Sequence, residues 1–88
     1  MYSVVTTEEF EKQYKKLDRS VQIMIQKWIK KHLVGTEDPR AQGKGLTGNL
    51  KGQWRYRIGN YRLVVEIRDE ELVIVAIDIN HRSRVYKK

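Results

Sequence analysis

Two different hydrophobic periods divide the chain. Between residues 7 and 33, apolar side chains recur at every third or fourth position, the spacing of helices with one buried face. From residue 53 onward they recur at every second position or fill whole segments, as in half-buried and fully buried strands. The early part of the chain is therefore predicted to be mainly helical, and the later part to form a sheet.

The helical part is predicted to contain two helices behind a short strand at residues 2–6. Thr6 stands three residues before Glu9, the spacing of a capping box, so the first helix is expected to begin there. Asp18 interrupts the pattern and caps a second helix, which runs to about Leu33. The helices are expected to form an antiparallel hairpin whose shared apolar face packs on a sheet.

The sheet part is predicted to be a meander. Its strands are expected at residues 53–58, 61–68 and 71–79, joined by Gly59-Asn60 and by Asp69-Glu70. The last strand is apolar on both faces, which indicates a buried position inside the sheet. The full order is β-α-α-β-β-β: an α+β fold with a helical hairpin on one face of a small antiparallel-rich sheet.

Chain length and one irregular segment complete the predicted organisation. Residues 1–88 are expected to make a single domain, because a chain of this size has no room for a second core. Residues 36–52 hold the only proline and four of the six glycines. This segment either closes over a ligand or merely connects the second helix to the sheet.

The strand pattern places arginines on the face that the helices leave open. Arg55 and Arg57 alternate with apolar residues along their strand, so both point away from the helices. A hairpin turn at Gly59-Asn60 brings Arg62 of the next strand onto the same face. Guanidinium groups suit a phosphate better than a core, because each offers two parallel N–H donors. An open, basic and concave surface is therefore expected.

Composition agrees with an anionic partner. The chain carries 18 Lys and Arg against 11 Asp and Glu, a net charge of +7. It has no cysteine and its two histidines lie far apart, so no metal or other cofactor is expected. No apolar run has the length of a membrane span and the N-terminus lacks signal-peptide features, so a cytoplasmic location without a membrane partner is expected.

Ordinary ion pairing is the alternative explanation for the arginines. Arg55 and Arg57 can form cross-strand pairs with acids on neighbouring strands. For the group as a whole, which includes Arg62 and Arg82, the phosphate-binding interpretation is favoured. The candidate acids are Glu66, Asp69 and Glu70.

Four segments carry a resemblance to a known family. They are Lys44-Gly45-Leu46-Thr47-Gly48, Trp54-Arg55-Tyr56-Arg57-Ile58, Tyr61-Arg62-Leu63-Val64 and His81-Arg82-Ser83-Arg84-Val85-Tyr86. Together with the helical hairpin, they resemble the RelE/ParE superfamily of bacterial toxins, and within it the RelE-like mRNA endonucleases. The resemblance covers essentially the whole chain. Its most specific part is the paired basic strands combined with the His-Arg-x-x-Val-Tyr ending.

This resemblance implies a toxin of a type II toxin–antitoxin module that cleaves mRNA in the A site of the 30S ribosomal subunit without a metal. The ribose 2′-hydroxyl attacks the adjacent phosphate, which gives a 2′,3′-cyclic phosphate and a 5′-hydroxyl. Such chemistry needs a base, an acid and positive charge around the phosphorane. The implied partners are a cognate acidic antitoxin and, only through the toxin–antitoxin complex, operator DNA.

The resemblance also implies roles for individual residues. Arg55 and Arg57 occupy the two basic positions of the first meander strand. Arg62 matches an arginine that stabilises the transition state. Arg82 matches a basic residue used as acid or phosphate ligand, and Tyr86 matches a tyrosine that stacks on or orients the substrate.

Proton transfer is the least determined part of this prediction. Several relatives carry lysine where this chain has Arg55 and Arg57, and arginine does not release its proton, so charge stabilisation is their expected role. Histidine side chains titrate near neutrality, so His81, or an activated Tyr86, is expected to move the proton. The alternative for His81 is a strand-end histidine that hydrogen-bonds to the backbone. Substrate-binding roles are expected for Lys44, Lys51 and Arg84, the last of which is otherwise a solvated surface charge.

Two other functions stay open at the level of the sequence. A ParE-like inhibitor shares the fold and poisons DNA gyrase without chemistry. An inert nucleic-acid-binding domain would use its arginines only to neutralise phosphates, with binding that falls steeply with salt. A supercoiling assay separates the first alternative from the endonuclease, and a turnover assay separates the second.

Overall fold

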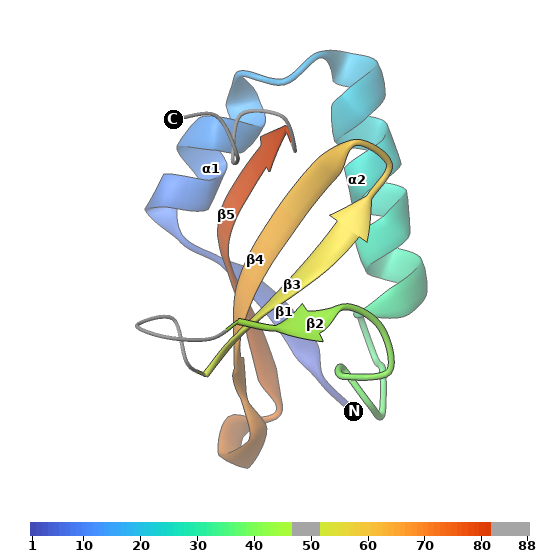
Figure 1. Cartoon of the computed structure of the whole chain (residues 1–88), viewed down its shortest axis with the longest axis vertical. Helices are drawn as coiled ribbons and strands as arrows, with labels where there is room; N and C mark the ends of the chain where they lie inside the picture. Colours follow the sequence, from blue (N-terminus) through green and yellow to red (C-terminus); the bar gives the residue numbers. More distant parts are fainter. Residues whose placement is uncertain (47–51, 82–88) are drawn as a thin grey trace.

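The computed structural model describes residues 1–46 and 52–81, and within these ranges the chain forms two helices and a five-stranded mixed sheet (Figure 1). The predicted α+β class is confirmed, and one short strand is added to the predicted order. No helix in these ranges is long and apolar enough to cross a membrane. The elements are β1 (Ser3–Thr6), α1 (Glu8–Lys15), α2 (Arg19–His32), β2 (Lys44–Gly45), β3 (Gln53–Ile58), β4 (Tyr61–Arg68), a 3-10 turn (Asp69–Glu71) and β5 (Val73–His81).

The strands lie in the order β1-β5-β4-β3-β2. β1 runs parallel to β5, and the other pairs are antiparallel. β3 and β4 form a hairpin whose turn has a positive φ of 60° at Gly59 but not at Asn60, the pattern of a type II′ turn. β5 is an interior strand between β1 and β4, as its two apolar faces indicate.

Both helices lie on the same face of the sheet (Figure 1). Burial of apolar surface between these two layers is the main force that holds the fold together. Ile25 of α2 and Leu33, the C-cap of that helix, are buried in one cluster with Tyr56 of β3 and Leu63 of β4. The core consists of Phe10, Ile25, Leu33, Tyr56, Ile58, Leu63, Val65, Ile67, Ile74, Ala76 and Ile79.

The predicted start of the first helix is wrong by one residue. Thr6 is the last residue of β1, where it pairs with Ala76. Thr7 is the N-cap of α1, and its Oγ1 accepts a hydrogen bond from the Phe10 amide at 3.1 Å. Asp18 is the N-cap of α2 as predicted, although its side chain makes no capping hydrogen bond.

The other differences lie in the connections. Residues 69–71 form a 3-10 turn and Leu72 adopts a left-handed conformation with φ 56°, so β5 begins at Val73 instead of residue 71 and extends to His81. Within the segment expected to be irregular, Lys44 and Gly45 pair with β3 as a two-residue strand. Hydrophobic periodicity does not reveal a strand this short.

Candidate active site

The strand register brings four cations together on the face of the sheet opposite the helices. Arg57 of β3 lies directly opposite Arg62 of β4. Arg55, which precedes Arg57 by two positions on β3, lies opposite Lys44 of β2. Residues directly opposite each other in an antiparallel pair project to the same side, about 5 Å apart at Cβ. Lys44, Arg55, Arg57 and Arg62 are called the basic face below.

Burial differs among the members of the basic face. Arg57 and Lys44 are exposed, whereas Arg55 and Arg62 are partly buried. Like charges placed directly opposite each other destabilise a sheet. An anion between the guanidinium groups of Arg57 and Arg62 would offset this repulsion.

The acids suggested as alternative partners are used elsewhere in the sheet. Glu66 Oε1 lies 3.4 Å from Arg68 Nη2. Asp69 forms a bidentate ion pair with Arg40, with both N–O distances at 3.0 Å. Two of the three candidate acids thus have arginine partners outside the basic face.

The same face continues onto β5 with an acid and an amide. Asn80 lies opposite Arg62, and Asp78 lies opposite Val64. The Asp78 carboxylate accepts hydrogen bonds from Gln13 Nε2 at 2.5 Å and from Asn80 Nδ2 at 2.9 Å. Sequence reasoning missed Asp78, because a bulge between Val64 and Val65 shifts the register of β4 against β5.

His81 lies on the other side of the sheet from the arginines. It pairs with Tyr61, on the same face as the core residues Leu63 and Ile79. The Tyr61 and His81 rings meet edge to face, with centroids 5.2 Å apart. The structure therefore places His81 at the end of the sheet beside Tyr61, across the sheet from Arg62. Its role in proton transfer stays a prediction.

The remaining predicted site residues are not among those the structure describes. Lys51 belongs to residues 47–51, and Arg82, Arg84 and Tyr86 belong to residues 82–88. Their proposed roles stay predictions.

A cleft of about 420 Å³ adjoins the basic face. Its lining includes residues from both faces of β3, which extends past β2. Basic residues and aromatic residues, the latter from α2, β3 and β4, are both present. This volume falls in the range of ordinary ligand sites. The lining residues are Trp28, Gln42, Gly43, Lys44, Arg55, Tyr56, Arg57, Tyr61 and Arg62.

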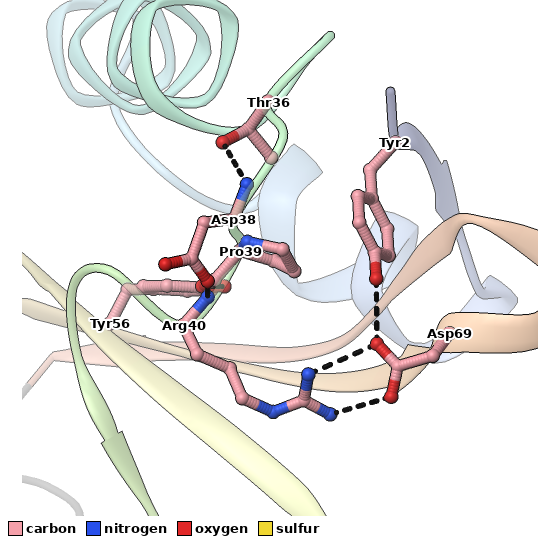
Figure 2. A network of polar contacts seen from close by, with 7 residues as sticks. All are labelled: Tyr2, Thr36, Asp38, Pro39, Arg40, Tyr56 and Asp69. Carbon is pink, nitrogen blue, oxygen red and sulfur yellow. Dashed lines mark hydrogen bonds and ion pairs between the residues drawn. The ribbon is translucent and has the colours of Figure 1, made fainter.

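Residues 36–43, called the wall below, lie beside the cleft and are hydrogen-bonded to β3 (Figure 2). The buried Tyr56 hydroxyl donates a hydrogen bond to the Pro39 carbonyl at 2.6 Å. The Trp54 indole Nε1–H donates to the Gln42 carbonyl at 2.6 Å. The described part of this segment connects α2 to the sheet and contributes Gln42, Gly43 and Lys44 to the cleft lining, and its closure over a ligand stays a prediction.

Gly43 allows this wall to approach β3 closely. Its φ is 83°, and a Cβ at this position would lie 2.1 Å from the Arg55 carbonyl oxygen. No other residue type fits there without moving the backbone. Sequence reasoning counted this glycine among loop residues, and only the three-dimensional contact reveals its part in the site.

Comparisons with known proteins were made at the level of sequence and structure. Residues 4–86 match a family described as the ParE toxin of the type II toxin–antitoxin system parDE. The chain belongs to the RelE/ParE superfamily of toxins. The toxin is 30% identical over 83 residues to a putative RelE-like toxin protein of Escherichia coli, a match that covers 94% of this chain and 85% of the relative.

A curated relative and a solved structure from Mycobacterium tuberculosis give further matches. Toxin RelG of Mycobacterium tuberculosis is 34% identical over 53 residues, which is 60% of this chain and 61% of that protein's length. The toxin–antitoxin complex RelBE2 of the same organism contains a chain that superimposes with a TM-score of 0.83 at 28% identity. That alignment covers 92% of this toxin and 98% of the matched chain.

Ionisation in the toxin is perturbed most clearly around the wall. Hydrogen bonds from Arg40 and then from Tyr2 lower the pKa of Asp69, and the Asp69 carboxylate in turn raises the pKa of Tyr2 (Figure 2). Burial raises the pKa of Tyr56 to about 12. At neutral pH Asp69 is therefore ionised and both tyrosines are protonated, so the hydrogen bonds that hold the wall are retained.

Two cleft residues of the toxin escaped sequence reasoning. Helical spacing assigns Trp28 to the core, and its ring does contact Tyr56, with centroids 5.3 Å apart. It is nevertheless only partly buried and reaches the cleft. Gln42 is a polar loop residue without a motif, and nothing in the sequence distinguishes it.

Proposed function

We propose that this toxin is a ribosome-dependent, metal-independent endoribonuclease that cleaves mRNA in the ribosomal A site. The observation that carries the proposal is the pairing of Arg57 with Arg62 on the face opposite the helices, beside Arg55 and Lys44. Several guanidinium groups that project from one face suit a phosphate group that gains negative charge during the reaction.

The proposed step is attack by the ribose 2′-hydroxyl on the adjacent phosphorus. The O2′–P bond forms, the P–O5′ bond breaks, and the products end in a 2′,3′-cyclic phosphate and a 5′-hydroxyl. Arg62 and Arg57 stabilise the charge on the phosphorane oxygens, since their guanidinium groups offer paired donors. Proton transfer is assigned to Arg82 and Tyr86, which follow β5 in the sequence. His81 is given no part in this step, because its register places it across the sheet from Arg62.

We infer that an acidic antitoxin is the physiological partner. The structural match to a chain of the RelBE2 toxin–antitoxin complex supports this inference, and so does the charge of +7. An acidic segment that covers the basic face would neutralise it and block RNA. Contact with operator DNA is proposed only for the complex, where the antitoxin would supply the DNA-binding part.

The direct test is primer extension on an mRNA translated in vitro with purified toxin. Wild-type toxin is expected to produce cleavage positioned by codon, and Arg62→Ala is expected to lower the rate at least about 100-fold, as for loss of one charge-stabilising donor. Arg68→Ala is the matched control, because Arg68 ends the same strand and pairs with Glu66. Absence of cleavage by the folded wild-type toxin would refute the proposal.

Gyrase inhibition is the second candidate, because the family description matched by the chain names ParE toxins. In that case the basic face would serve only for docking. A supercoiling assay with purified gyrase decides between the two: inhibition at toxin concentrations that leave translated mRNA intact would replace the endonuclease proposal.

A further inference from the structure

We propose that the outer face of α2 binds the phosphate backbone of double-helical RNA while single-stranded RNA lies on the basic face. The outer face of α2 consists of four exposed cations, Arg19, Lys27, Lys30 and Lys31. This inference rests on the proposed function in one respect, because the strand on the basic face is the RNA to be cleaved. It adds a contact with folded RNA on the other side of the sheet.

α2 carries charged side chains of one sign only. Its segment Arg19–His32 contains no Asp or Glu, and its four Lys and Arg give +4 of the net charge of +7. The start of a helix favours acids and disfavours cations. α2 nevertheless begins with Arg19, and the only acid beside it is the N-cap Asp18. Stabilisation of the helix itself therefore does not account for this charge.

The lysines lie together on the side of α2 that faces away from the sheet. Ile25 is on the buried side, whereas all three lysines are exposed. Lys27 is three positions from Lys30 and four from Lys31, so these like charges are neighbours on the helix surface and repel one another. None of the ion pairs in the described part of the chain involves a residue of α2. A bound polyanion would offset this repulsion.

α1 has no such excess of positive charge. It contains three acids and two lysines, and Lys12 and Lys15 each stand four positions after a glutamate, a spacing that stabilises a helix. Both helices lie on the same face of the sheet (Figure 1). Lysines of α1 therefore provide a matched control for the cations of α2.

A lysine-rich surface suits nucleic acid better than it suits protein. Three of the four cations on the outer face of α2 are lysines. Protein–protein interfaces are depleted in lysine and enriched in arginine and aromatic residues. The lysine ammonium group is a hydrated point charge that binds phosphate without a fixed geometry. The phosphates of an RNA backbone are therefore the favoured partner.

The lack of an exposed aromatic ring on α2 favours double-helical over single-stranded RNA. Proteins that bind single strands combine cations with rings on which the bases stack. The exposed large apolar side chains of α2 are Ile23 and Met24, and its tryptophan, Trp28, lines the cleft. Double-helical RNA is recognised mainly through its shape and backbone. Arg19 and Lys31 are about 18 Å apart along the helix axis, so the cations can follow several phosphates.

The two RNA-binding surfaces lie on opposite sides of the sheet. α2 covers one side, and Arg57 and Arg62 of the basic face project from the other (Figure 1). A double helix on α2 therefore leaves the basic face open to a single strand. In the proposed function, this contact would hold the toxin on folded RNA of the ribosome while mRNA is cleaved.

The test measures the two kinds of binding separately with the purified full-length toxin. Fluorescence anisotropy is recorded with a labelled RNA duplex of about 16 base pairs and with a labelled single strand of 2′-O-methyl RNA, whose blocked 2′-oxygens cannot attack. Lys27→Gln/Lys31→Gln is expected to weaken duplex binding about tenfold and to reduce its salt slope by about 1.8, at about 0.9 per phosphate contact. Binding of the single strand is expected to stay unchanged.

Two controls establish that the effect belongs to α2. Lys12→Gln/Lys15→Gln removes the same charge from α1 and is expected to leave duplex binding unchanged. Unlabelled single strand at a saturating concentration is expected to leave the labelled duplex bound. Circular dichroism melting curves establish that each variant is folded. Equal losses of duplex affinity in the two double variants overturn the inference, and so does displacement of the duplex by the single strand.

Labelled poly-L-glutamate tests an acidic protein as the partner instead. If Lys27→Gln/Lys31→Gln weakens binding of poly-L-glutamate but not of the duplex, α2 serves an acidic protein and the inference is overturned. Binding of poly-L-glutamate that is weaker than duplex binding and unaffected by this variant supports RNA as the partner.

Cleavage of translated mRNA separates this inference from the proposed function. Lys27→Gln/Lys31→Gln is expected to raise the toxin concentration for half-maximal cleavage about tenfold and to leave the rate at saturation unchanged. An unchanged concentration would show that α2 does not hold the toxin on the ribosome. If mRNA is cleaved but the duplex results fail, the inference fails and the proposed function stands. If the duplex results hold but no mRNA is cleaved, α2 binds folded RNA and the endonuclease proposal fails.

Discussion

At the scale of single residues, the site depends on close approaches that few side chains tolerate. Gly43 lies against the Arg55 carbonyl and lets the wall at residues 36–43 reach β3. Tyr56 is buried and fastens the same wall through its hydroxyl. Neither residue is expected to touch the phosphate. Both help to position the residues that are proposed to contact it.

Gly43→Ala is expected to destabilise the toxin by more than about 2 kcal/mol, because the new Cβ meets backbone that cannot move aside. Gly35→Ala is the matched comparison. Gly35 also has a positive φ, of 77°, but nothing lies within 4 Å of the added Cβ, so only the conformational cost of about 1–2 kcal/mol remains. Urea unfolding of both variants measures the difference. Equal losses would show that the contact with Arg55 is unimportant.

Tyr56→Phe is expected to cost about 1–3 kcal/mol at neutral pH, because it leaves the Pro39 carbonyl without its buried donor. The loss should depend on pH. The pKa of Tyr56 is raised to about 12 in the folded state, so its contribution is complete below pH 10 and declines as the pH rises from 10 towards 12. Melting temperatures of both proteins from pH 8 to 11.5 should therefore converge at the alkaline end. A constant gap would contradict this explanation.

At the scale of elements, the connection between α2 and β3 determines the shape of the cleft. It is tied to the 3-10 turn between β4 and β5 as well as to β3, because Arg40 pairs with Asp69 in that turn (Figure 2). The Arg40 guanidinium also lies over the Trp54 ring, 5.9 Å from its centroid. The wall is thus bound both to β3 and to the 3-10 turn.

Asp69→Asn is expected to lower the melting temperature by a few degrees at pH 7, because the pair with Arg40 is exposed and screened. The pKa of Asp69 is lowered in the folded state, so its contribution is present above the pKa of an unfolded Asp, about 4, and is lost as the pH falls below it. The difference from wild type should vanish near pH 2–3. Glu70→Gln, at the neighbouring acid outside this pair, serves as the control.

The elements also show what the sequence makes predictable. Periodicity predicts both helices and the three long strands, because burial of one face demands regular spacing. It does not predict β2, whose two residues are too few to show a period. Periodicity also does not predict which face of the sheet Asp78 occupies, because a bulge shifts the register between β4 and β5. Strand alternation predicts that the arginines share one face. It does not predict that Trp28 and Gln42 line the same cleft, because only tertiary contacts bring them there.

At the scale of the whole molecule, the distribution of charge governs binding. The two helices cover one face of the sheet, and the basic face lies on the other. RNA bound there, as proposed, would release counterions, and each phosphate contact to a single strand contributes about 0.7 to the slope of log affinity against log salt.

Arg57→Gln is expected to reduce the magnitude of this slope by about 0.7 for a single-stranded RNA of mixed sequence. Lys12→Gln removes the same charge from α1 and is expected to leave the slope unchanged. Anisotropy titrations between 50 and 300 mM salt provide the measurement. Equal changes in the two variants would indicate a general effect of net charge and would argue against a contact at Arg57.

The parallel pairing of β1 with β5 has a consequence for how the toxin is made. Val4 finds its partner, Ile74, 70 positions further along the chain. Synthesis proceeds from the N-terminus, so β1 has no parallel neighbour until β5 has been translated. Native contacts of such long sequence separation form late and slowly. The edge of the sheet at β1 is therefore expected to be among the last parts of the fold to form, which pulse-labelling hydrogen exchange during refolding can measure.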